Sequence, residues 1–267
     1  MGDLFHALTV APLDCPDAPT VLNVADEVPV RLLFNGILPH GVMMMTPDHL
    51  EDFAFGYCLT EEIVHSADQI RSVVVAEGDD GPTLDVRIAG ECLAGLLRRR
   101  PRAQTGHSSC GLCGSDDVPS VHAAETAPFP VAYTIAPVAV RRALDDLDRW
   151  QDLNARTRMV HAAAWADRDG RILLIREDVG RHNALDKLIG ARMRDAAIQT
   201  DGICLLSSRY SFEMALKTVR SGMATVVAVS APTYRAYQLA ERMNQTLIAI
   251  ARHDRQLVFC GGARLAR

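Results

Sequence analysis

The sequence predicts an α/β protein with a smaller N-terminal α+β domain at residues 1–102 and a larger α/β domain at residues 131–267. In the second half, short apolar runs alternate with amphipathic segments, which predicts a largely parallel sheet covered by helices on both faces. In the first half, the predicted strands come in pairs. Between the halves, residues 103–130 are rich in Gly and Ser and predict a flexible loop.

Composition bounds the class of protein. Of the 267 residues, 48% are hydrophobic, enough for a sizeable core, and the net charge of −5 argues against a nonspecific nucleic-acid binder. No apolar run reaches the length of a membrane span, and the N-terminus lacks a signal pattern. The seven scattered cysteines do not resemble a disulfide framework. We therefore expect a soluble cytoplasmic protein with reduced thiols.

The N-terminal elements follow from turn and cap signals. Residues 1–25 predict an extended arm or an edge strand. Asn35-Gly36 favours a type I′ turn, so residues 28–34 and 37–46 predict a hairpin. Thr46-Pro47 predicts the start of a helix, because Thr can cap and Pro suits the first helical position. Two strands, 70–77 and 83–89, and a helix, 91–100, complete this half.

The second half predicts four helices and six strands. The helices are expected at 137–153, 181–194, 212–220 and 234–244. The strands are expected at 159–165, 171–176, 203–208, 225–230, 247–251 and 257–260.

The predicted loop carries the most reactive pattern of the chain, Cys110 and Cys113 in a C-x-x-C spacing flanked by glycine. Three chemistries use this spacing. A redox pair needs a βαβ setting, and no strand pattern precedes Cys110. A zinc site needs about four ligands, of which His107 and the two cysteines would supply three. A sulfur relay needs an accessible thiolate that can attack a persulfide. The spacing alone leaves all three open.

Polar side chains follow three of the predicted strands. Residues 177–187 (EDVGRHNALDK) end a strand and open a helix, where free N–H groups can bind anions. Arg181 can make a bidentate hydrogen bond to a phosphate, and Asn183 can donate to and accept from a base or ribose. Residues 207–209 and 230–233 follow later strands in the same way. Such loops would converge on one crevice. No G-x-G-x-x-G or P-loop motif accompanies them.

Taken together, CGLCG at 110–114, the stretch 177–187, SFEM at 211–214 and SAPT at 230–233 resemble the formate dehydrogenase accessory sulfurtransferase family (FdhD-type). The resemblance covers residues 20–260. It implies a cytidine-deaminase-like three-layer α/β/α fold for the larger domain, and a homodimer. It also implies a sulfurtransferase that takes persulfide sulfur from a cysteine desulfurase. The sulfur would pass to bis-molybdopterin guanine dinucleotide before that molecule enters formate dehydrogenase. The dinucleotide would be a bound substrate of this protein and not a permanent cofactor.

Site residues follow from the same resemblance. The family's persulfide cysteine matches Cys110, and Cys113 is expected to be catalytic as well, either as a second sulfur carrier or as the thiol that resolves the mixed species; no metal is expected. A cofactor-binding segment near the C-terminus matches Ile250, Ala251, Arg252, His253, Asp254 and Arg255. From the polar residues after the predicted strands, rather than from the resemblance, the guanine nucleotide end of the cofactor is also expected to bind at Arg181, His182, Asn183, Ser208 and Arg209.

Three rival readings remain. A cofactor chaperone would bind the molybdenum cofactor without using a thiol. A zinc-dependent deaminase needs H-x-E or C-x-E before P-C-x-x-C. Here His122 and Glu125 come after the C-x-x-C and at H-x-x-E spacing, so the motif order argues against deamination. Zinc could also structure the loop.

Overall fold

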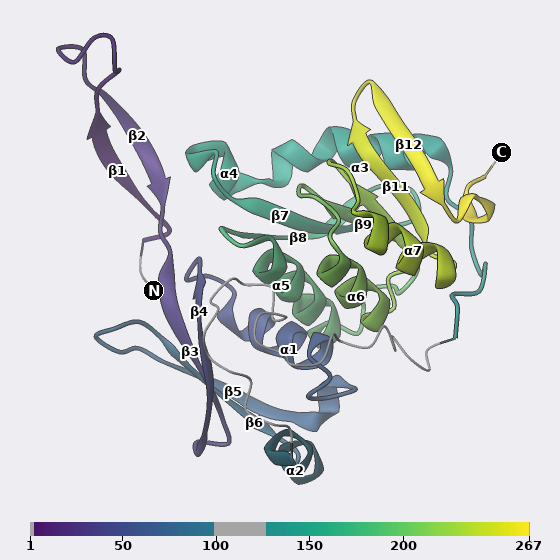
Figure 1. Ribbon diagram of the computed structural model, residues 1–267, viewed down its shortest axis with the longest axis horizontal. Coiled ribbons are helices and arrows are strands. Elements are labelled where there is room, and N and C mark those ends of the chain that lie inside the picture. The colour runs from purple at the N-terminus through teal and green to yellow at the C-terminus, as the bar shows by residue number, and fades with distance from the viewer. Residues whose placement is uncertain (1–2, 99–126, 267) are drawn as a thin grey trace.

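The computed structural model describes residues 3–98 and 127–266 and confirms the α/β class (Figure 1). Within these residues the chain forms a four-stranded sheet, a six-stranded sheet and a separate two-stranded hairpin. None of the described helices is long and apolar enough to cross a membrane. The domain boundaries at 102/103 and 130/131 stay predictions, because most of the connecting segment lies outside the described residues.

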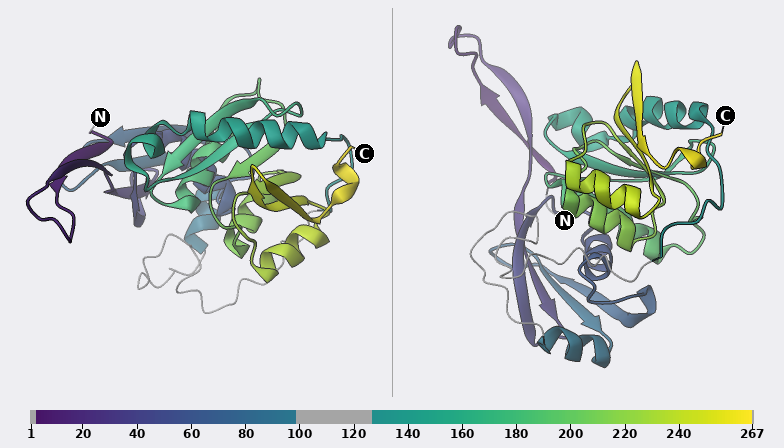
Figure 2. Two further views of the ribbon diagram at one scale, coloured as in Figure 1. Left: turned by 90° about the horizontal axis from the view of Figure 1, so that it is seen from above. Right: turned by 45° about the vertical axis from the view of Figure 1, so that its right-hand side comes forward.

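The N-terminal arm is a β-hairpin, β1 (Phe5–Val10) and β2 (Thr20–Ala25), that projects from the body of the molecule (Figures 1 and 2). At its base, the Ala25 backbone N–H lies 3.2 Å from Met159 Sδ, and the Arg156 guanidinium lies over the Phe5 ring at 5.4 Å. The sequence predicted an extended arm or an edge strand here; the structure pairs the segment with itself.

The N-terminal sheet has the order β4-β3-β6-β5. This part of the chain consists of β3 (Val28–Phe34), β4 (Leu38–Met45), α1 (Leu50–Thr60), the 3-10 helix η1 (Ala67–Gln69), β5 (Ile70–Ala76), β6 (Thr83–Ile88) and α2 (Gly90–Arg98). Asn35 and Gly36 have φ of 52° and 70°, as the predicted type I′ turn requires. The predicted helix start at Thr46 is wrong: α1 begins at Leu50, and Thr46 is used elsewhere.

The C-terminal sheet has the order β12-β11-β10-β9-β7-β8. The strands of this sheet and the helices between them are α3 (Pro137–Trp150), α4 (Asp152–Thr157), β7 (His161–Ala166), β8 (Ile172–Asp178), α5 (Arg181–Arg194), β9 (Ile203–Leu206), α6 (Phe212–Arg220), β10 (Thr225–Ala228), α7 (Tyr234–Arg242), β11 (Thr246–Arg252), β12 (Arg255–Cys260) and the 3-10 helix η2 (Gly262–Arg264). The prediction of a largely parallel sheet is wrong. Only β9–β10 and β10–β11 pair in parallel, because hairpins add β8 and β12 and β7 joins β9 antiparallel.

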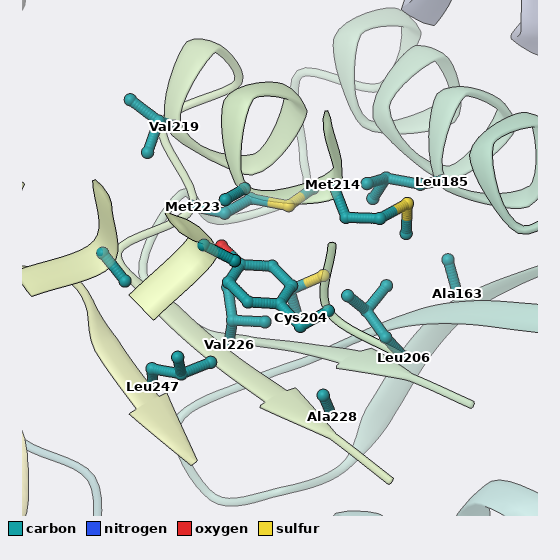
Figure 3. Packing of buried hydrophobic residues seen from close by; sticks show 14 of the residues in the cluster. Ala163, Leu185, Cys204, Leu206, Met214, Val219, Met223, Val226, Ala228 and Leu247 are labelled. Atoms are coloured by element: carbon teal, nitrogen blue, oxygen red, sulfur yellow. The ribbon is translucent and has the colours of Figure 1, made fainter. Parts of the chain in front are cut away.

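Helices cover both faces of this sheet (Figure 2). On one face α3 packs its apolar side, including Val140, Ala143 and Leu147, against alternate strand residues such as Leu205 and Val227. On the other face α5, α6 and α7 cover a second cluster. In Figure 3 Met214 and Met223 lie over Cys204, Leu206 and Val226. The alternation of inward and outward residues along each strand supplies both clusters.

The long helix predicted at 137–153 is broken at Gln151 into α3 and α4. The Glu177 carboxylate, at the end of β8, accepts the backbone N–H groups of Leu153 and Asn154 at 2.9 and 2.8 Å. These two donors open α4 and have no partner within that helix. Glu177 therefore fixes the start of α4, which periodicity alone could not indicate.

The two parts of the chain meet where α1 crosses α5 at unusually short distance (Figure 1). A Cβ atom added to Gly56 would lie 1.8 Å from the Asp186 carbonyl oxygen. A Cβ added to Gly190 would lie 1.8 Å from the Asp52 carbonyl oxygen. Only glycine allows backbones to approach this closely. The crossing ties the N-terminal sheet to the helix that opens with Arg181.

Candidate functional site

One edge of the C-terminal sheet gathers the polar loops. Strands β9, β10 and β11 run in parallel, and β8 points the same way because β7 is antiparallel to both β8 and β9. Helices α5, α6 and α7 therefore all begin at this edge. Backbone hydrogen bonds join the loops: Val229 N–H donates to Leu206, and Ile250 N–H donates to Ser230. We call this the strand-end edge.

Three side chains at the strand-end edge carry buried polar atoms that have no hydrogen-bond partner within the described residues. They are Arg181 at Nε, His182 at both ring nitrogens and Ser211 at Oγ. His182 is only 2% exposed. Ser211 is the N-cap residue of α6, yet its hydroxyl makes no capping bond. Buried polar groups normally have partners, so three unsatisfied side chains along one edge of the sheet make this edge a candidate ligand site. We call them the orphan cluster.

The electrostatics of the orphan cluster suit an anion. Burial, and then the charge of Arg181, lowers the pKa of His182 from its ordinary 6.5 to about 3. His161, which starts β7 and is half-buried, also has a lowered pKa. There the causes are burial and the charges of Arg181 and Arg209, partly opposed by Asp178. The histidines are therefore neutral near pH 7. A neutral imidazole N–H can still donate to a phosphate oxygen beside the arginines.

Asn183 faces the N-terminal sheet instead. Its side-chain amide donates to the Met44 carbonyl at 3.0 Å and to Asp178 Oδ1 at 3.1 Å, and the residue is 2% exposed. Lys187 donates to Asp178 Oδ2 at 2.6 Å and to the Thr46 carbonyl at 2.9 Å, with both charged side chains fully buried. Much of the 177–187 stretch thus holds the two parts of the chain together.

A second buried ion pair involves Asp186, the residue directly before Lys187 on α5. Lys217 of α6 donates to both carboxylate oxygens of Asp186 at 2.9 and 2.8 Å, and to Thr60 at the end of α1. Thr60 Oγ1 also donates to Asp186 at 2.8 Å. Burial raises the pKa of the Asp186 carboxyl, and Lys217 opposes that rise. This network fixes α1, α5 and α6 next to His182.

The two other predicted residues after β9 have different surroundings. Ser208 is 5% exposed, and its hydroxyl donates to the Arg209 carbonyl at 3.1 Å. Arg209 is exposed and acts electrostatically on His161. The structure therefore places Arg209 near the orphan cluster. Ser207, which was not among the predicted site residues, accepts the Ala162 N–H at 2.8 Å and supports the loop.

The C-terminal segment lies on a separate hairpin. Ile250 is at the strand-end edge and has a φ of 51°, rare for a β-branched residue, beside a register shift between β11 and β12. Ala251 is buried, whereas residues 252–255 form the exposed turn. His253 Nδ1 lies 2.7 Å from Asp145 of α3, on the other face of the sheet. Arg252, His253, Asp254 and Arg255 are thus separated from the orphan cluster by the intervening strands.

Cys110 and Cys113 lie outside the described residues. Of the cysteines that are described, Cys58, Cys92 and Cys204 are buried, Cys260 is partly buried and Cys15 is exposed. Burial raises the pKa of the Cys58 thiol, that of Cys204 to about 12 and that of Cys260 to about 11. These thiols are poor nucleophiles. Among the described residues, no three His, Cys, Asp or Glu side chains gather as a metal site.

The sequence analysis missed His161 and Ser211 as site residues. Ser211 was visible as a Ser directly before a helical pattern, which reads as an ordinary N-cap. Its hydroxyl proves to be unused, and only the structure shows this. His161 begins a strand, and nothing in its neighbours marks it.

Comparison with known proteins agrees with this architecture. The model of the FdhD/NarQ family matches residues 25–266. A sulfur carrier protein FdhD from Bordetella bronchiseptica is 43% identical over 91% of this chain and 87% of its own length. One from Xanthomonas euvesicatoria is also 43% identical, over 91% and 85%. A crystal structure assigned as a formate dehydrogenase accessory protein from Desulfotalea psychrophila superposes with a TM-score of 0.74. It covers 98% of both chains at 23% identity, which shows the shared fold. The chain belongs to the FdhD/NarQ family.

Proposed function

We propose that this protein is a sulfurtransferase. It accepts sulfur from a cysteine desulfurase as a persulfide on Cys110 and delivers it to bis-molybdopterin guanine dinucleotide for use by formate dehydrogenase. Family membership supports this proposal, since curated relatives are named sulfur carrier proteins and the structural neighbour is described as a formate dehydrogenase accessory protein. The proposed setting is the cytoplasm, where thiols stay reduced. The proposed assembly is a homodimer, as the resemblance implies.

The sulfur chemistry balances with the two thiols of the C-x-x-C pair, Cys110 and Cys113. The Cys110 thiolate attacks the outer sulfur of the desulfurase persulfide, forms a new S–S bond and releases the desulfurase cysteine as a thiolate. Delivery of the outer sulfur as sulfide requires two electrons. The Cys113 thiol supplies them when it attacks Cys110, forms the Cys110–Cys113 disulfide and expels the sulfide. An external dithiol then reduces the disulfide.

The described cysteines support the choice of thiol. Cys58, Cys204 and Cys260 have pKa values raised by burial, so little thiolate forms near neutral pH. Cys15 is exposed but has no second thiol within a few residues. Cys110 and Cys113 form the one closely spaced pair in the sequence.

The orphan cluster is the observation that carries the cofactor-binding part of the proposal. Arg181 supplies charge, while Ser211 and neutral His182 supply donors at the starts of α5 and α6, where free backbone N–H groups also favour anions. A cation beside several hydrogen-bond donors is a combination that can bind a diphosphate. We assign the diphosphate of the guanine nucleotide end to the orphan cluster, with Arg209 at its rim. Ile250 lies further along the same edge, near the end of β11, where its N–H donates to the Ser230 carbonyl.

Calorimetry with GDP tests this assignment. Arg181→Ala removes a charge-assisted phosphate contact, which is worth about 1.5–3 kcal/mol, and so should weaken GDP binding roughly 10- to 150-fold. Arg168→Ala is the matched control, because Arg168 is an exposed arginine in the turn between β7 and β8, at the opposite edge of the sheet. If both variants fold normally and bind GDP like the parent, the strand-end edge is not the cofactor site.

A further inference from the structure

Two tyrosines form an exposed aromatic pair on the first turn of α7. Tyr234 is 73% exposed, and its ring stacks on that of Tyr237 with centroids 6.2 Å apart and an interplanar angle of 30°. The Tyr237 hydroxyl donates to Glu241 Oε1 at 2.6 Å, one turn further along the same side of the helix. Glu241 therefore fixes Tyr237, Tyr237 lies against one face of the Tyr234 ring, and most of the Tyr234 ring stays open to solvent.

This pair does not serve the core. The buried side of α7 consists of Ala236, Leu239 and Ala240. The start of the helix is already satisfied by Thr233, whose hydroxyl accepts the Ala236 N–H. An oriented aromatic ring that is largely exposed and does not contribute to packing suggests a contact with something outside the fold.

Hydrogen bonds place the pair beside the orphan cluster. Tyr210 N–H donates to the Ala231 carbonyl at 3.3 Å, and Thr233 N–H donates to the Tyr210 carbonyl at 2.9 Å, so the residues before α6 and α7 run side by side. Ser211 is therefore one strand spacing from the start of α7. Three strand spacings, about 14 Å, separate β10 from β8. An extended nucleoside diphosphate can span from Tyr234 to Arg181.

We propose that the open face of Tyr234 stacks on the purine base of the guanine nucleotide whose diphosphate occupies the orphan cluster. This inference rests on the proposed function and adds a base subsite to it. Aromatic side chains bind bases through their π-faces. Tyr237 keeps the ring in place before the ligand arrives, so little rotamer freedom is lost on binding.

Two probes separate the base subsite from the phosphate subsite: GDP, and inorganic pyrophosphate, which has no base. Tyr234→Ala should weaken GDP binding roughly 5- to 150-fold and leave pyrophosphate binding unchanged. Tyr234→Phe keeps the ring and should bind GDP like the parent. Arg181→Ala should weaken the binding of both probes. Trp150→Ala removes another exposed aromatic, at the end of α3 on the opposite face of the sheet, and should change neither.

The outcomes distinguish the two proposals, with thermal unfolding used to show that each variant is folded. Parental GDP binding by Tyr234→Ala, beside weakened binding by Arg181→Ala, overturns the base subsite and leaves the proposed function standing. Parental binding by both variants overturns the phosphate site as well. A loss of pyrophosphate affinity in Tyr234→Ala, or an equal loss of GDP affinity in Trp150→Ala, also overturns the base subsite.

Discussion

The glycine crossing of α1 and α5 leads to a prediction whose sign is fixed by geometry. In Gly190→Ala the new Cβ would lie 1.8 Å from the Asp52 carbonyl oxygen, whereas ordinary contact begins at 3.4 Å. The helices must therefore separate by 1.6 Å or bend. The atoms that the new Cβ would meet belong to the backbone of Asp52 and Gly56, so a change of side-chain rotamer cannot relieve the overlap.

Overpacking of this kind costs typically 1–3 kcal/mol, and we expect the upper end, about 3 kcal/mol, because backbone meets backbone. Ala has a higher helix propensity than Gly by about 1 kcal/mol, but this gain is smaller than the cost of the overlap between the two backbones. For a chain of this size, 3 kcal/mol corresponds to a fall in Tm of about 6–12 °C.

Differential scanning calorimetry of Gly190→Ala measures this change. Gly95→Ala is the matched control: Gly95 also lies inside a helix, α2, but a Cβ there would meet nothing within 4 Å. The control should be more stable than the parent by about 0.5–1 kcal/mol. A Gly190→Ala protein that unfolds at or above the parental temperature would refute the reasoning about the crossing.

Two further predictions concern buried ionisable groups. Lys187→Met leaves the fully buried Asp178 carboxylate without its cation and should lower the free energy of unfolding in urea by about 3–5 kcal/mol. The control Arg149→Met breaks an exposed pair with Asp146 and should lower it by at most about 1 kcal/mol. Equal losses in the two variants would contradict this account. Because the folded-state pKa of His182 is about 3, below its ordinary 6.5, unfolding takes up a proton as the pH falls below 6.5. His182 should therefore lower stability by about 2 kcal/mol between pH 7 and pH 5, and His182→Gln should remove that part of the slope; parallel pH profiles for the two proteins would count against a buried neutral histidine.

Local signals predicted much of the fold. Asn35-Gly36 specified its turn because both positions need positive φ, and the bounds of α5 and α6 match their periodic patterns. Thr46-Pro47 misled, because Thr46 accepts the Val179 N–H at 3.2 Å and binds Lys187 through its carbonyl, across the contact between the two parts. A local cap signal cannot show that a distant segment uses the same residue.

The direction of the strands was also hidden. The hairpins β7–β8 and β11–β12 place antiparallel pairs at both ends of the C-terminal sheet, and β7 also pairs antiparallel with β9. Strand length and apolar content are the same for either direction.

The candidate site was predictable in place but less so in detail. Strand-end loops and the 177–187 stretch indicated the edge on which Arg181 and His182 lie. The structural role of Asn183 was not predictable, since its partner, the Met44 carbonyl, comes from the other half of the chain. Ser211 resembles an ordinary cap in sequence, and its significance rests on a hydroxyl that makes no bond.

Sulfur loading of Cys110 tests the central claim most directly. The parent, Cys110→Ala and Cys113→Ser would be incubated with a cysteine desulfurase and cysteine, and the site of the added sulfur located by peptide mass spectrometry. The same samples would then be assayed for activation of formate dehydrogenase. The account predicts one extra sulfur on Cys110 in the parent, and neither loading nor activation with Cys110→Ala. Full activation by Cys110→Ala would instead show a cofactor chaperone that needs no thiol, and extra sulfur on Cys58, Cys204 or Cys260 would contradict the assignment of the carrier.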